Sequence, residues 1–199
     1  MASLPPIAEL PTLDTEERAQ VLDLLFEPCQ QLHTLSVSSL RENTFSSYDE
    51  LIEAVGKQLT ELSESNLESD NKWLEAILSA HPRLGEKKVE SEQSRKEQAQ
   101  LNQGGEGEAA TLAEMNRKYE ETFPGLRYVT LFIDDPLPSR PLTHSINICS
   151  VFVNGRSRPV IMADMRKRIE RGDLKQEKQD AITAMCEIAS DRAKKLGAS

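Results

Sequence analysis

The chain has 199 residues, a length that suits one domain with a substantial hydrophobic core. Its 24 basic and 33 acidic side chains give a net charge of -9, which argues against nucleic acid or an anionic membrane as the main partner. Three cysteines without CxxC spacing argue against a disulfide scaffold, and no stretch reaches the roughly 18 apolar residues of a membrane-spanning helix. A small anionic substrate stays compatible with this composition, because a local arginine can outweigh distant negative charge.

The first half of the chain has the pattern of amphipathic helices. Capping-box pairs at residues 14–17 and 47–50 each precede apolar side chains at helical spacing. A third helix around residues 73–78 should end near His81, because Pro82 disfavours helical geometry in the residue before it. We therefore predict at least three packed helices before the middle of the chain.

The second half begins with a polar stretch whose glycines at residues 104–107 indicate a surface loop. Further helices are predicted around residues 112–119, 160–169 and 182–196. The first of them should end before Pro124, which cannot continue a helix. Together with the first half, this pattern indicates that most of the chain is helical.

Residues 127–157 break the helical pattern. Residues 128–133 are β-branched and aromatic, which favours a strand, and residues 146–153 have the same character. Asn154 and Gly155 then form a hairpin-type turn signal. We expect an irregular or strand-like segment here, including residues 130–150, within the otherwise helical chain.

His81 is the first candidate for chemistry. A histidine held at a helix end by the following Pro82 is a well-placed acid or base. The alternative is a structural residue that the helix dipole favours at this end, and the residues by themselves favour that interpretation. His33 and His144 have no such context, so we expect them to be structural or exposed.

The second candidate is the segment 94–98, where Ser94, Glu97 and Gln98 share one helical face. A hydroxyl, a carboxylate and a carboxamide suit a ligand rich in amide and ureido groups. Ser-x-x-Glu is also a capping box, and a capped helix start can carry a site as well.

The third candidate is Arg192, which falls close to the apolar stripe of the last helix, where a charge needs a partner. Its guanidinium could bind a substrate carboxylate through two hydrogen bonds, or it could lie at the surface near the helix end. The basic run at residues 166–171 is more typical of a solvated helix face. Motifs for phosphate loops, zinc sites and nucleophile elbows are absent from the sequence, which argues against a site of these types, a zinc site included.

Taken together, these residues resemble the ureidoimidazoline decarboxylase family, whose substrate is 2-oxo-4-hydroxy-4-carboxy-5-ureidoimidazoline (OHCU). That family has a His-Pro-x-Leu motif, then Ser-x-x-Glu-Gln, a Tyr- and Phe-rich stretch, and an arginine after a Glu-Ile segment. This chain carries the same motifs, in the same order, at residues 81–84, 94–98, 116–123 and 187–192.

The resemblance extends over residues 10–196 and implies an all-α, single-domain helical bundle, a homodimer and no cofactor. It implies a carbon–carbon lyase that converts the ureidoimidazoline to (S)-allantoin in urate catabolism. Carried over by position, the catalytic residues are His81, Glu97 and Arg192, with Arg192 binding the substrate. Substrate-binding residues would be Pro82, Ser94, Gln98, Tyr128 and Val129, the last two largely through backbone groups.

The family pattern is interrupted near residues 130–150, which have no counterpart in it. One interpretation is a genuine surface insertion, and another is a retained intron in the gene model. If the segment interrupts the pocket wall, the chain would be weakly active or inactive. Intact-mass measurement of the native protein distinguishes the first two interpretations.

Two other functions stay open at this point. The chain could be a non-catalytic helical binding or scaffold protein with the same fold, or an enzyme that processes another ureide. We expect a cytoplasmic protein with a small-molecule partner. A peroxisomal location also stays open, although the C-terminal residues are not the Ser-Lys-Leu signal.

Overall fold

The computed structural model describes residues 3–86, 91–99, 106–130, 132–133, 153–154 and 158–198. Within these ranges the side chains of residues 97–99, 106–108, 132–133, 153–154 and 158 lie outside the description.

The described residues form an α-helical fold, as the sequence predicts. A short 3-10 helix, η1 (Ile7–Thr12), precedes the first of the α-helices. In chain order the elements that follow are α1 (Thr15–Leu25), α2 (Gln30–Glu42), α3 (Tyr48–Glu64), α4 (Glu68–Leu78), α5 (Glu92–Ala99), α6 (Glu106–Thr122), β1 (Phe132–Ile133), β2 (Val153–Asn154), α7 (Arg158–Arg171) and α8 (Leu174–Lys195).

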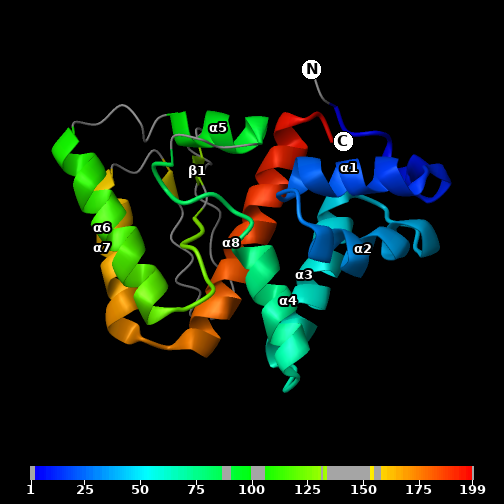
Figure 1. Cartoon of the computed structure of the whole chain (residues 1–199). Coiled ribbons are helices and arrows are strands. Elements are labelled where there is room, and N and C mark those ends of the chain that lie inside the picture. The colour runs from blue at the N-terminus through cyan, green and yellow to red at the C-terminus, as the bar shows by residue number, and fades with distance from the viewer. Residues whose placement is uncertain are drawn as a thin grey trace, which may run out of the picture.

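The longest helix, α8, is the centre of the arrangement. It packs against α1, α3 and α4, while α6 packs against α7 (Figure 1). Figure 1 shows α1 to α4 grouped on one side of α8 and the α6–α7 pair on the other. The core between α8 and its neighbours consists of aliphatic and sulfur-containing side chains, among them Leu22, Leu25, Leu51, Val55, Leu74, Ile77, Ile182, Met185 and Ile188.

Two helix starts follow directly from the sequence. Asp14 accepts a hydrogen bond from the Glu17 amide at 2.8 Å, and the Glu17 carboxylate accepts one from the Asp14 amide at 2.9 Å, which completes the predicted capping box. Ser47 caps α3 by accepting a hydrogen bond from the Glu50 amide. The Glu50 carboxylate instead accepts two hydrogen bonds from Ser46, which lower the pKa of Glu50.

In the described part of the strand-like region, two short strands form a sheet. β1 and β2 pair in parallel, with Phe132 opposite Val153 and Ile133 opposite Asn154. Asn154 therefore belongs to a strand, and the hairpin turn predicted to begin there is wrong. Residues 128–130 carry no strand, while residues 134–152 and Gly155, which include most of the expected insertion, lie outside the described residues.

One expectation about the polar segments needs correction. The loop expected at residues 104–107 is wrong at its end, because α6 begins at Glu106. In the described part of the chain, none of the helices is long and apolar enough to cross a bilayer.

Candidate active site

His81 lies three residues beyond the end of α4, and its side chain is buried, with 6% of its surface exposed. The Ala80 amide still bonds to the Ile77 carbonyl, so the chain leaves the helix in a tight turn before Pro82. The Arg127 guanidinium donates a hydrogen bond to the His81 carbonyl at 3.0 Å. This contact ties the backbone of His81 to the segment that follows α6.

A buried polar cluster brings together two of the other predicted site residues, Ser94 and Arg192, with a third residue, Glu27. The three side chains come from α5, α8 and the segment after α1, and only 2%, 2% and 4% of their surfaces are exposed. Arg192 Nη2 lies 2.7 Å from Glu27 Oε1 and 3.0 Å from Ser94 Oγ. The Ser94 hydroxyl donates to the same oxygen, Glu27 Oε1. The guanidinium, the carboxylate and the hydroxyl are therefore each in contact with the other two.

The local structure at the end of α1 explains why an arginine fits there. The last carbonyls of a helix have no partner within the helix and attract cations. Arg192 Nη1 donates to the Phe26 carbonyl and lies 3.5 Å from the Leu25 carbonyl. Each of the two terminal nitrogens of Arg192 thus makes contact with protein groups, and α8 is fixed against the end of α1.

The structure changes the interpretation of Ser94. α5 begins at Glu92, so Ser94 lies inside the helix and does not cap it. The capping group is Ser91, whose hydroxyl accepts a hydrogen bond from the Ser94 amide at 3.1 Å. Glu97 and Gln98 follow on the same helix, and their side chains lie outside the described part of the chain.

Tyr128 and Val129 are buried after α6, and Tyr128 joins a second polar cluster. Its hydroxyl donates to Asp164 Oδ2 at 2.6 Å, and the Arg168 guanidinium lies 5.0 Å from the centre of its ring. Arg168 also donates hydrogen bonds to Asp164 at 3.0 Å and to Glu177 at 3.1 Å. Its side chain is buried between these partners. The prediction that the basic run is a solvated face is therefore wrong for Arg168.

The second cluster explains how the segment after α6 is held. Glu177 is fully buried and accepts hydrogen bonds from Tyr119 at 2.5 Å and from Arg171 at 2.6 Å. Because Tyr119, Arg168 and Glu177 come from α6, α7 and α8, the cluster connects the α6–α7 pair to the central helix. Asn116, in the Tyr- and Phe-rich stretch, donates to the Leu84 carbonyl at 3.0 Å and so links α6 to the segment after His81.

The family model described as OHCU decarboxylase matches residues 11–194. The chain belongs to this family. The match spans all of the helices from α1 to α7 and nearly all of α8, including His81, Ser94 and Arg192. The family implies a carboxy-lyase of urate catabolism that acts on a small molecule. A search among curated proteins finds no match to the chain.

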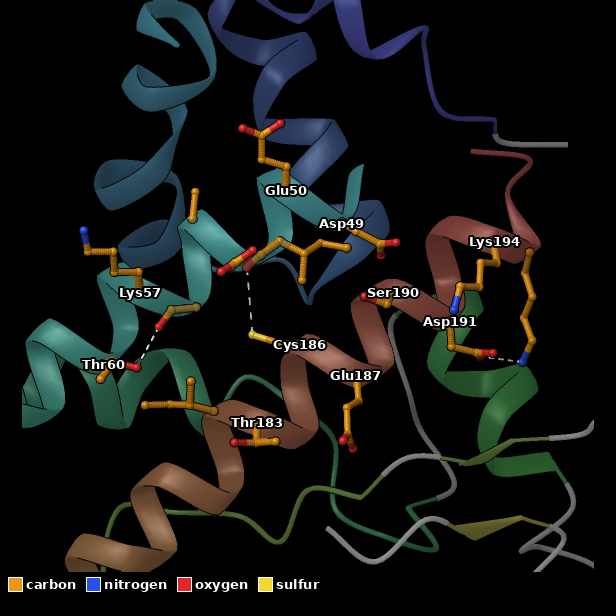
Figure 2. A pocket seen from close by; sticks show the side chains of 16 residues that line it. Asp49, Glu50, Lys57, Thr60, Thr183, Cys186, Glu187, Ser190, Asp191 and Lys194 are labelled. Carbon is orange, nitrogen blue, oxygen red and sulfur yellow. Dashed lines mark hydrogen bonds and ion pairs between the residues drawn. The ribbon is translucent and has the colours of Figure 1, made fainter. Parts of the chain in front are cut away.

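A separate groove of about 1160 Å³ lies between α3 and α8 (Figure 2). Its lining contains none of the predicted site residues and no histidine. Five carboxylates line it, against three lysines: Asp49, Glu50, Glu53, Glu187, Asp191, and Lys57, Lys194, Lys195. Since a decarboxylase binds a carboxylate substrate, this acidic lining makes the groove a poorer candidate than the buried residues around Arg192.

Glu27 is the site residue that the sequence did not predict. The place of Arg192 near the apolar stripe of the last helix indicates that its charge needs a partner, but nothing in the spacing points to a residue 165 positions away. The available signal is an acidic residue between the apolar Phe26 and Pro28, at the place where the helical pattern ends. Among the described residues, no group of three or more potential ligands could hold a metal ion.

Proposed function

We propose that this protein is a cofactor-independent decarboxylase that converts 2-oxo-4-hydroxy-4-carboxy-5-ureidoimidazoline to (S)-allantoin. The observation that carries the proposal is the family match over residues 11–194. The burial of His81 and of the cluster around Arg192 supports it, because both place acid–base and anion-binding groups away from bulk solvent.

The substrate supplies its own electron sink. Its carboxylate is attached to the ring carbon next to a C=N bond. When the bond to the carboxylate breaks and CO2 leaves, the electron pair forms a C=C bond in the ring and the imine nitrogen gains a proton. The ring hydroxyl then loses its proton as the neighbouring carbon gains one, which yields allantoin. The enzyme has to orient the carboxylate and move these protons on one face.

His81 is proposed to move the proton, and Arg192 to orient the carboxylate. A carboxylate that approaches Arg192 would replace the contact of the guanidinium with Ser94, since a hydroxyl can rotate towards the ligand while Glu27 keeps its ion pair. Glu97 would tune His81, and Ser94 and Gln98 would bind the ureido and ring amides.

The wall of the proposed pocket consists of Pro82 together with the backbone of Tyr128 and Val129. Tyr128 and Val129 are buried in the fold, and the Tyr128 hydroxyl bonds to Asp164, so their contact with the substrate is proposed to come from backbone groups. We also propose that residues 10–196 act as one catalytic domain, that the chain forms a homodimer, and that it works in the cytoplasm.

The His81→Ala variant tests the proposal. Loss of a general acid–base group should lower the rate of enzymatic decarboxylation by about 10²–10⁴-fold while the helical fold is preserved. The rate is measured with substrate freshly made by urate oxidation, and the fold by far-ultraviolet circular dichroism.

The matched control is His33→Ala. His33 forms a 2.6 Å ion pair with Asp23 between α1 and α2, and its loss should leave the rate unchanged. Unchanged turnover in His81→Ala would overturn the assignment of His81. Absence of any rate enhancement by the wild-type protein would favour a non-catalytic scaffold.

A further inference from the structure

We propose that Glu27 is a positioning residue that fixes the direction of the Arg192 guanidinium and moderates its positive charge. The inference rests on the proposed decarboxylation, in which Arg192 binds the carboxylate of the substrate. It assigns a role to a residue that lies outside the motifs at residues 81–84, 94–98 and 187–192.

The geometry places Glu27 in direct contact with the groups it would position. Its Oε1 atom accepts from both Arg192 Nη2 and the Ser94 hydroxyl. All three side chains are nearly fully buried, so solvent screens their charges weakly. Each is supplied by a different segment, which means that the cluster forms only when α1, α5 and α8 are assembled.

Direction is the first consequence of this contact. An arginine side chain has several rotatable bonds, and an unanchored guanidinium would sample many orientations. Here Glu27 and Ser94 hold Nη2, while the Phe26 carbonyl holds Nη1. The plane of the guanidinium is therefore fixed before the substrate arrives, which reduces the entropic cost of orienting the carboxylate.

Charge is the second consequence. During decarboxylation the negative charge leaves the carboxylate and moves into the ring. An uncompensated buried cation at the carboxylate would stabilise the ground state more than the transition state, and such binding does not accelerate the reaction. The anionic Glu27 beside Arg192 reduces this excess stabilisation. Arg192 can then orient the carboxylate without holding it too tightly.

Glu27→Gln is the decisive variant, because glutamine keeps the length of the side chain and one hydrogen-bond acceptor but removes the charge. We expect kcat to fall about tenfold and KM to fall as well, since the carboxylate then meets a stronger cation. The steady-state rates are measured at a temperature at which circular dichroism shows the variant to be fully folded. A change that only loosened the fold would not lower KM.

The control is Asp23→Asn, which also removes a carboxylate from an ion pair on or next to α1. It should leave kcat and KM unchanged. If Glu27→Gln shows an unchanged or raised KM, the inference is overturned. If the wild-type protein itself gives no enzymatic decarboxylation, the proposed function fails and the inference fails with it, so the two failures are distinguishable.

A second variant covers the case in which Glu27→Gln does not fold. Glu27→Asp keeps the charge but withdraws it from Arg192 by one methylene group, which weakens the ion pair without removing it. We expect this variant to fold and to lower both kcat and KM, each by less than tenfold. A wild-type KM in Glu27→Asp, with a lower kcat, would contradict the role of Glu27 in moderating the charge.

Discussion

The ion pair between Arg192 and Glu27 differs from most ion pairs at the surface because it is buried, together with Ser94. An exposed pair such as Glu68 with Lys72 is screened by water and contributes little to stability. Removing one partner of a buried pair, in contrast, leaves an uncompensated charge and costs about 3–5 kcal/mol. We therefore expect truncation of Glu27 or Arg192 to impair the fold, Glu27→Gln to destabilise it less because the hydrogen-bond acceptor is kept, and Glu27→Asp to destabilise it least because the charge is kept.

The sequence predicts His81 and Arg192 as candidate site residues because each lies in a short motif with recognisable chemistry. Glu27 could not be predicted, since its ion pair joins positions 165 residues apart and local spacing carries no record of such a contact. The burial of Arg168 could not be predicted either, because it depends on Glu177, which the following helix brings against it. Burial of a charge depends on tertiary packing, which helical periodicity predicts for apolar residues better than for charged ones.

Glu187, half-buried at the groove between α3 and α8, provides a test of pH dependence (Figure 2). Its pKa is raised, mainly by burial and against the opposing effect of Arg168. The folded state therefore holds this proton more tightly than the unfolded state, and the contribution of Glu187 to stability falls as the pH rises through the interval between the two pKa values.

The Glu187→Gln variant should accordingly be more stable than the wild type at neutral pH, by at most about 0.5 kcal/mol because the group is partly exposed. The difference should disappear below the pKa of the unfolded state. Urea titrations at pH 7 and at acidic pH measure it. A variant that is less stable than the wild type at pH 7 would contradict the burial of this carboxyl group.

At the level of elements, α3 and α8 pack closely at Gly56. A Cβ atom at Gly56 would lie 2.8 Å from Cys186 Sγ, which is shorter than real contacts of this kind. The absence of a side chain at Gly56 thus allows α3 to approach the central helix closely. The same approach buries the Cys186 thiol and raises its pKa to about 11.

The Gly56→Ala variant should therefore destabilise the protein by up to about 2 kcal/mol, because the cost of overpacking, about 1–3 kcal/mol, is offset in part by the roughly 1 kcal/mol that alanine gains over glycine in a helix. The free energy of unfolding is measured by urea denaturation. The double variant Gly56→Ala/Cys186→Ala removes the sulfur atom that the new methyl group would meet, so it should recover part of the loss relative to Cys186→Ala alone. Strictly additive effects would contradict a direct clash between these two positions.

Helix boundaries could be predicted where a capping side chain marks them. Asp14 and Ser47 begin α1 and α3 through the expected hydrogen bonds. The start of α5 could not, because Ser91 and Ser94 both have the chemistry of a cap and only the structure shows that Ser91 serves as one. The strand predicted over residues 128–133 is present at Phe132–Ile133 but not at residues 128–130, where Tyr128 and Val129 are buried after α6 without strand pairing.

At the scale of the whole molecule, α8 unites the two polar clusters. Near its start, Glu177 bonds to Arg168 and Tyr119 and so connects the α6–α7 pair. Near its end, Arg192 bonds to Glu27 and Ser94 and so connects α1 and α5 (Figure 1). The helical bundle could be predicted from the periodicity, but the clusters depend on which helices are neighbours, and a single sequence does not give that information.

The most direct test of the account is the handedness of the allantoin that the wild-type protein forms. Freshly prepared 2-oxo-4-hydroxy-4-carboxy-5-ureidoimidazoline is mixed with the full chain, and circular dichroism follows the product. We predict rapid appearance of the (S)-allantoin signal, because the proton would be delivered to one face of a bound intermediate. Product that forms no faster than without protein, and that shows no optical activity, would contradict the proposed function.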